Sequence, residues 1–272
     1  MSRIGATIKA RQSQGQKALI PYLVAGDPNL PTTAQLMHAL VAAGADIIEL
    51  GFPFSDPSAD GPVIQKGAER SLAAGTTLRD VLELVSQFRQ SNADTPVVLM
   101  GYLNPIEIMG YERFVNEAST AGVDGVLIVD MPPVESGQMI KLLRQQQMDA
   151  IFLVAPTTSA ARAELISKQC SGYLYYVSLK GVTGAAITDT ESIRRNVRNL
   201  KKLSDLPVVI GFGIKDEKSA ASMAELADGV VIGSALVERI AELENKSQHS
   251  DADIAATVSL FATVRKILDN FN

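Results

Sequence analysis

The sequence predicts an α/β protein in which eight parallel strands, each followed by a helix, close into a barrel. Strand-like apolar runs alternate with helical patterns eight times along the chain. The runs lack the polar alternation of a half-exposed strand, which indicates burial on both faces and parallel pairing through helical crossovers. A length of 272 residues without any linker-like stretch suits one such unit. We therefore expect residues 1–272 to form a single (β/α)8, or TIM-barrel, domain.

Eight short runs, rich in branched apolar residues and bounded by glycine, proline or polar residues, are the expected strands. They cover residues 18–25, 47–50, 96–100, 125–129, 150–154, 173–177, 207–210 and 229–232. An open, doubly wound sheet is the alternative arrangement. It is disfavoured because no G-x-G-x-x-G motif follows the first run, and because eight units of this length suit closure better.

Apolar residues at helical spacing mark the expected helices. These cover residues 33–43, 64–72, 78–88, 111–121, 134–147 and 160–168, a segment around 193–200, and the segments after the last two strands. Thr77 with Asp80 has the spacing of a capping box, and Ser159 can cap the helix that follows it. Ile4 and Ile8 lie one helical turn apart, which predicts an additional N-terminal helix closing the bottom of the barrel. A terminal amphipathic helix is expected over residues 254–268.

Composition restricts the partners to small molecules or other proteins. The net charge of -5 is spread along the chain without a basic patch, which argues against nucleic-acid binding. No apolar run reaches the roughly 18 residues of a membrane span, and the first residues lack the apolar core of a signal peptide. We therefore expect no membrane association and a cytoplasmic location.

The scarcity of cysteine and histidine limits the chemistry. Cys170 is the only cysteine, and His38 and His249 are the only histidines. An internal disulfide is excluded, and neither histidine has a ligand at metal-site spacing. We expect Cys170 to be an inert core or helix-end residue. Acid–base chemistry must then depend on carboxylates or tyrosines.

Glu49 lies inside the apolar second strand, where a carboxylate costs several kcal/mol of desolvation unless it is paired or protonated. One interpretation is a structural ion pair with a lysine or arginine on a neighbouring strand. The loop that follows favours a functional one. It carries Asp56 and Asp60 between Pro53 and Pro62, as expected where a rigid strand end presents side chains to a site.

In a parallel barrel all strand-to-helix loops lie on one face, where active sites are found. This places Glu49, Asp60, Tyr102, Asp130 and Thr183 around one mouth, together with the glycines that end the last two strands. The segments containing Gly211, Phe212 and Gly213, and Gly233 and Ser234, offer bare backbone N–H groups and a helix N-terminus to a phosphate. The alternative is that these glycines only turn the chain.

These residues resemble the alpha subunit of tryptophan synthase over essentially the whole chain. The motifs that carry the resemblance are I-E-L-G with Glu49, F-S-D-P-S-A-D-G-P, G-V-T-G, G-F-G-I and I-G-S-A. The departures are modest: Ser58 replaces a usual apolar residue, Tyr22 stands where phenylalanine is frequent, and Leu179 with Lys180 replaces a sequence that often carries arginine.

The resemblance implies a lyase of tryptophan biosynthesis that cleaves indole-3-glycerol phosphate to indole and glyceraldehyde 3-phosphate, a retro-aldol reaction. Glu49 then suits general acid–base catalysis, and Asp60 would accept the indole N–H as the ring becomes positive. The expected substrate-binding residues are Tyr22, Met100, Tyr102, Leu127, Phe152, Tyr175, Thr183, Gly184, Phe212, Gly213, Gly233 and Ser234. Leu153 is also expected to pack against the indole. Residues 178–189 are expected to form a lid.

The resemblance also implies a partner, the tryptophan synthase beta subunit, in an alpha-two beta-two heterotetramer. Pro53 and Asp56 are then expected on the face that contacts it. No cofactor or metal is expected in this chain, and pyridoxal phosphate belongs to the beta partner.

Two other functions stay open at this point. One is another phosphate-binding barrel, such as an indoleglycerol-phosphate synthase, a sugar-phosphate isomerase or an epimerase. A synthase of that kind should carry a lysine acid near the strand ends, and no lysine lies inside an apolar strand. The other is a non-catalytic barrel that only activates a partner enzyme, against which the presence of both Glu49 and Asp60 argues.

Overall fold

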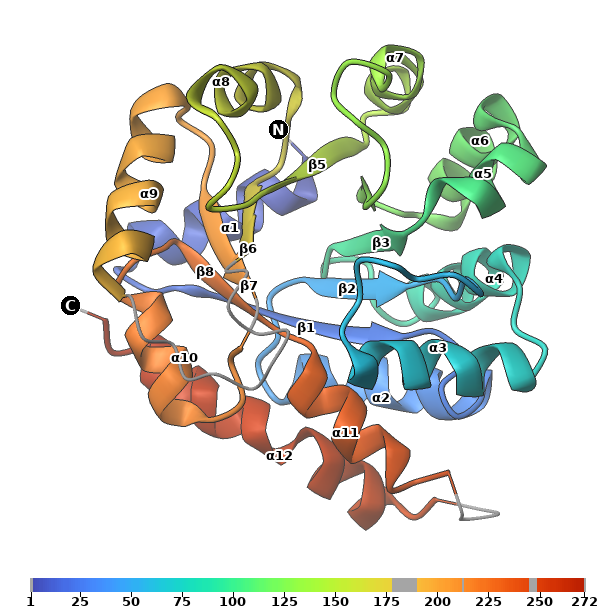
Figure 1. Ribbon diagram of the computed structural model, residues 1–272. Helices are drawn as coiled ribbons and strands as arrows, with labels where there is room; N and C mark the ends of the chain where they lie inside the picture. The colour runs from blue at the N-terminus through green and yellow to red at the C-terminus, as the bar shows by residue number, and fades with distance from the viewer. Residues whose placement is uncertain (1, 178–189, 212, 245–248, 272) are drawn as a thin grey trace.

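The computed structural model describes residues 2–177, 190–211, 213–244 and 249–271 and has the predicted closed parallel barrel (Figure 1). Each strand pairs with the next in chain order, and β1 pairs with β8 to close the ring. The strands are β1 (Ala18–Val24), β2 (Ile48–Gly51), β3 (Val97–Gly101), β4 (Gly125–Ile128), β5 (Asp149–Val154), β6 (Leu174–Val177), β7 (Val208–Gly211) and β8 (Gly229–Ile232). The open doubly wound alternative is therefore wrong.

Helices surround this barrel and follow the strands as the apolar spacing predicts (Figure 1). They are α1 (Arg3–Ser13), α2 (Leu30–Ala42), α3 (Pro62–Ala73), α4 (Leu78–Arg89), α5 (Leu103–Met109), α6 (Tyr111–Ala121), α7 (Gly137–Gln145), α8 (Ala160–Gln169), α9 (Thr190–Leu203), α10 (Glu217–Ala224), α11 (Ser234–Ala241) and α12 (Asp251–Leu268). Thr77 and Asp80 form the predicted capping box of α4, and Ser159 caps α8 through the backbone N–H of Arg162.

Two segments differ from the prediction. The helix expected over residues 134–147 is shorter at both ends, because a turn precedes α7 and Gln147 has a left-handed backbone with φ of 58°. The helix α5 was not predicted. Its Pro105 lies in the first turn, where a missing backbone N–H breaks no helical hydrogen bond.

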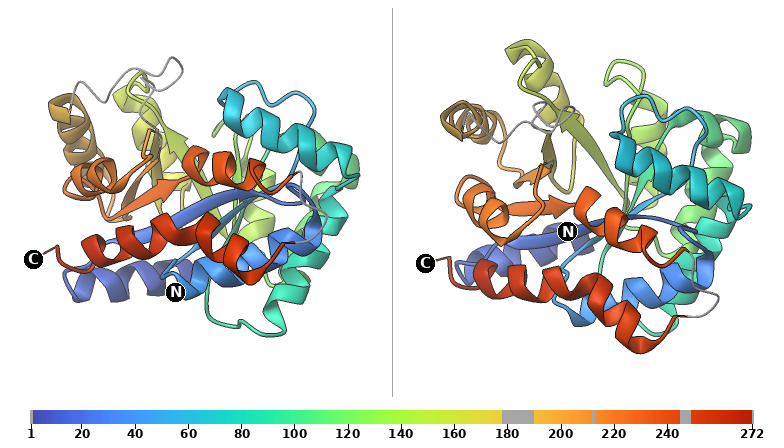
Figure 2. Two further views of the ribbon diagram at one scale, coloured as in Figure 1. Left: turned by 90° about the horizontal axis from the view of Figure 1, so that it is seen from below. Right: turned by 60° about the horizontal axis from the view of Figure 1, so that its bottom comes forward.

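The bottom of the barrel is closed by α1, as predicted. Ile4 and Ile8 are fully buried and belong to the interior cluster of apolar residues with Ile20, Ile47 and Val98. A second, larger cluster fills the space between the strands and the outer helices. Figure 2 shows α1 beside α12, and the ion pairs of Arg11 and Arg265 with Asp46 tie both helices to the residues before β2. This packing leaves the opposite end of the barrel free to carry a cavity.

No helix within the described ranges is both long and apolar enough to cross a bilayer.

Candidate active site

Glu49, in the second position of β2, is fully buried and has no basic partner among the described residues. The Tyr173 hydroxyl, just before β6, donates a hydrogen bond to Oε1, while Oε2 has no hydrogen-bond partner among the described residues. None of the ion pairs between described residues includes this carboxyl. Burial raises the pKa of Glu49 to about 8, against a smaller lowering by the Tyr173 hydrogen bond. A structural ion pair therefore does not explain this residue in the described part of the chain.

Asp60 lies in the loop between β2 and α3. Among the contacts that hold this loop, the Asp60 backbone N–H donates to the Pro57 carbonyl at 3.0 Å, and Gln65 Nε2 donates to the Asp60 carbonyl at 2.9 Å. Burial raises the pKa of the Asp60 carboxyl to about 6, and a hydrogen bond from Tyr102 partly offsets that rise. At neutral pH, Asp60 is therefore mostly ionised while Glu49 is mostly protonated.

A cavity of about 450 Å³ opens at the carboxyl ends of the strands, the end predicted to carry the site. Its walls include the side chains of Tyr22, Asp60, Met100 and Tyr175. Tyr22 pairs in register with Glu49 across β1 and β2, and the Glu49 charge contributes to raising the pKa values of Tyr22 and Tyr175. Glu49 does not itself line the cavity, but it acts on Tyr22 and Tyr175, which do.

The other end of this cavity is lined by backbone. Gly213 has a φ of 76°, a left-handed conformation that disfavours residues with a side chain. Gly233 is the N-cap of α11 and Ser234 is its first residue, and no described side chain caps this helix end. A side chain at Gly233 would meet the Tyr22 ring, with its Cβ 3.2 Å from Cδ1. The first amides of α11 therefore face a cavity, and glycine keeps it open.

Comparison with known proteins identifies the family. A family model described as tryptophan synthase alpha chain matches residues 8–265. The tryptophan synthase alpha chain of Nitrosococcus oceani is 52% identical over 269 residues, which cover 99% of this chain and 98% of that protein. That of Thioalkalivibrio sulfidiphilus is 54% identical over 269 residues, with coverage of 99% and 100%. The chain belongs to the tryptophan synthase alpha chain family.

A solved structure of this family agrees with the barrel. The crystal structure of tryptophan synthase subunit alpha from Legionella pneumophila str. Paris has a TM-score of 0.91 and 42% sequence identity, and the match covers 99% of both chains. The chain is thus a lyase of tryptophan biosynthesis that catalyses the alpha reaction, the cleavage of indole-3-glycerol phosphate to indole and glyceraldehyde 3-phosphate. The other barrel enzymes and the non-catalytic subunit are not favoured.

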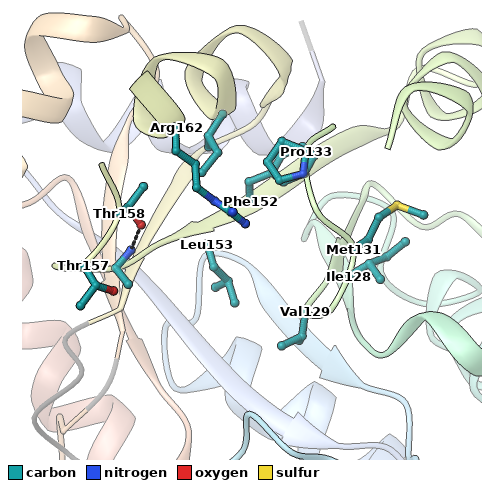
Figure 3. Close-up of a pocket in the computed structure, with 11 residues that line it drawn as sticks. Ile128, Val129, Met131, Pro133, Phe152, Leu153, Thr157, Thr158 and Arg162 are labelled. Atoms are coloured by element: carbon teal, nitrogen blue, oxygen red, sulfur yellow. Dashed lines mark hydrogen bonds between the residues drawn. The ribbon is translucent and has the colours of Figure 1, made fainter. Parts of the chain in front are cut away.

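Not all residues that the family resemblance suggested lie on the cavity. Leu127 is fully buried in the interior cluster and does not line it. Phe152 packs in the outer cluster and lines an adjoining pocket of about 340 Å³ beside α8, where Arg162 also lies (Figure 3). Leu153 and Val129 line both this pocket and the catalytic cavity. Successive residues of a strand face opposite sides, so only one of Phe152 and Leu153 can reach the substrate side.

The remaining predicted positions are spread over the mouth. Tyr102 lines a small adjoining space with Asp60, and its hydroxyl accepts the Ala59 N–H at 3.0 Å. In the loop after β2, Asp56 is exposed and Pro53 is buried, and their place at a partner interface stays a prediction. Thr183, Gly184 and Phe212 lie outside the described residues.

Tyr173 was missed as a site residue by the sequence analysis. It lies two positions before Tyr175, so both rings face the same side of β6, and this spacing was the available signal. Its partner Glu49 is 124 positions away, so the hydrogen bond itself could not be read from the sequence.

Metal and thiol chemistry find no support among the described residues. No group of three or more histidine, cysteine, aspartate or glutamate side chains there is arranged to hold a metal ion. Cys170 is buried at the end of α8, and burial raises the pKa of its thiol to about 12. Such a thiol stays protonated and is a poor nucleophile.

Proposed function

We propose that Glu49 is the general acid and base of the alpha reaction, and the unpartnered Oε2 is the observation that carries this assignment. A carboxyl with a pKa of about 8 is protonated at neutral pH and can donate to carbon 3 of the indole ring. That protonation makes the ring an electron acceptor. The bond from carbon 3 to the side chain then breaks, its electron pair restores the aromatic ring, and Glu49 accepts the hydroxyl proton as the carbon becomes an aldehyde.

Asp60 is proposed to stabilise the ring nitrogen during this step. Protonation at carbon 3 places positive charge on that nitrogen, and an ionised carboxylate accepting its N–H lowers the energy of the charged species. The pKa of about 6 supports the ionised form at neutral pH. Tyr22, Met100, Leu153 and Tyr175 then supply the walls on either side of the ring.

The substrate phosphate is proposed to lie against Gly213, Gly233 and Ser234. An uncapped helix start offers N–H groups and a positive dipole end, which suit a dianion. The cavity that contains these residues also contains Asp60, so one ligand can span from the phosphate end to the ring end.

Glu49→Gln tests this mechanism. The amide keeps the shape of the side chain but cannot exchange the required protons, so we expect indole release to fall at least a thousandfold. Binding of glycerol 3-phosphate should stay within a few-fold of wild type. Turnover above about a tenth of wild type would exclude Glu49 as the acid and base, and no indole release by the wild type would exclude the reaction itself.

The beta subunit of tryptophan synthase is the proposed partner, in an alpha-two beta-two assembly with pyridoxal phosphate in the beta chain. Two exposed apolar side chains support a docking surface at the mouth: Ile108 of α5 is 81% exposed and Val134 is 76% exposed. The segments that carry them are joined where the Leu103 N–H donates to Asp130 at 2.7 Å. Exposed large apolar residues of this kind are typical of interfaces.

Ile108→Asp tests the docking surface. A carboxylate at this position would have to be desolvated on docking, so we expect affinity for the beta subunit to fall at least tenfold while indole release by the free chain is unchanged. Leu203→Asp is the matched control, because Leu203 is also exposed but lies at the end of α9. Equal affinity of both variants for the beta subunit would rule out this surface.

A further inference from the structure

Two side chains of opposite charge line the phosphate end of the catalytic cavity and have no role in the mechanism above. Lys215 comes from the loop between β7 and α10, and Glu238 comes from α11, one helical turn after Ser234. Neither forms an ion pair between described residues. Both charges are therefore free to act on a ligand in the cavity.

The backbone of Lys215 is anchored, although its side chain is exposed. Its N–H donates to Ser219 Oγ at 3.1 Å, within the capping box that Asp216 and Ser219 form at the start of α10. On its other side Ile214 is buried. The root of the lysine side chain is thus fixed beside Gly213, where the proposed phosphate would lie.

We infer that Lys215 is a specificity residue that attracts the substrate's phosphate, and that Glu238 opposes it. The inference rests on the phosphate position proposed above. Near neutral pH a phosphate monoester carries a charge of about -1.5 to -2, whereas backbone N–H groups offer only partial charges. A full ammonium charge at the rim favours a phosphorylated ligand, and a carboxylate on the same cavity disfavours it. Because both groups are exposed, the effect should be modest and sensitive to salt.

Lys215→Met tests the role of the ammonium group, with Lys218→Met as the matched control. Lys218 lies three residues further along, is exposed and acts on the same Asp216, but it does not line the cavity. At low ionic strength we expect Lys215→Met to raise KM for indole-3-glycerol phosphate roughly three- to tenfold, with kcat within about twofold. The difference from wild type should shrink as salt is added, and Lys218→Met should resemble wild type.

Glu238→Gln should act in the opposite direction and lower KM by about twofold, while Glu242→Gln, at the C-cap of the same helix and outside the cavity, should not. Glycerol 3-phosphate should bind more weakly to Lys215→Met and more tightly to Glu238→Gln than to the wild type. Binding of unphosphorylated indole should be the same in all variants. If the wild type cleaves the substrate but the two lysine variants are indistinguishable, the inference is wrong and the catalytic assignment stands. A wild type without cleavage would overturn both.

Discussion

The buried carboxylates of the active site have different partners from two buried carboxylates at the bottom of the barrel, although Asp27, also at the top, is paired with Arg70. At the bottom, Asp46 and Asp124 are buried and each is bound by two arginines. At the top, within the described part of the chain, Glu49 has one tyrosine partner and one oxygen without a hydrogen bond, and Asp60 accepts a hydrogen bond from Tyr102. The residue type is the same at both ends, so the partners decide whether a buried acid supports the fold or is available for chemistry.

Asp124 shows how complete the pairing at the bottom is. Its carboxylate accepts from Arg3 Nε at 2.5 Å, from Arg89 Nη2 at 2.7 Å and from the Val97 N–H at the start of β3 at 2.8 Å. Asp46 has a similar set, with Arg11, Arg265 and the Leu19 N–H of β1. These acids join neighbouring strands and the outer helices, which is a structural role.

After Glu49→Gln, the largest loss of activity is expected for Asp60→Asn. Loss of the negative charge beside the ring nitrogen should lower turnover by about 10² to 10³, with little change in thermal stability.

Rates measured against pH for the wild type should fall below about pH 6, where Asp60 becomes protonated, and above about pH 8, where Glu49 loses its proton. The residual rate of the variant should not fall below about pH 6, because the group that titrates there has been removed. Asp56→Asn, an exposed acid of the same loop, should behave as wild type, and equal rates for both variants would remove Asp60 from the mechanism.

A second experiment compares stability at the two ends. Asp124→Asn leaves two arginines without their buried partner and should lower the free energy of unfolding by about 3 kcal/mol, while the folded fraction keeps its turnover.

Glu49→Gln should act the other way on stability. The pKa of Glu49 is raised on folding, so the wild type loses stability as pH rises from about 4.5 to about 8. The variant should therefore be more stable than the wild type above pH 8, by on the order of a few kcal/mol, and equal to it near pH 4. Urea unfolding at both pH values measures this difference. A stability loss for Glu49→Gln like that of Asp124→Asn would abolish the distinction between the two ends.

The smallest effect is expected for Tyr173→Phe. Its hydrogen bond lowers the pKa of Glu49, so removing the hydroxyl should raise that pKa and move the fall in rate at alkaline pH to higher pH. Tyr176→Phe removes a hydroxyl of β6 that accepts a hydrogen bond from Asn196 Nδ2, and it should leave the fall in rate at alkaline pH unchanged. If the rate of Tyr173→Phe falls at the same alkaline pH as that of the wild type, Glu49 is not the group whose ionisation causes the fall.

The sequence predicted the barrel well because buried parallel strands and amphipathic helices leave strong periodic signals, as in the β8 run of residues 229–232. It failed where local patterns are ambiguous. Pro105 suggested a loop although it lies in the first turn of α5, and the continuous apolar run of β5 could not show that Leu153, not Phe152, faces the cavity. The hydrogen bond between Tyr173 and Glu49 depends on closure of the barrel, which no local pattern encodes.

The unpartnered oxygen of Glu49 has a consequence for how such a chain can evolve. A buried acid that is costly at neutral pH is retained only while catalysis selects for it. A duplicated copy released from that selection would gain stability from an amide or apolar residue at this position, and the same single change would end its activity. Replacing Glu49 would therefore make this barrel both more stable and inactive.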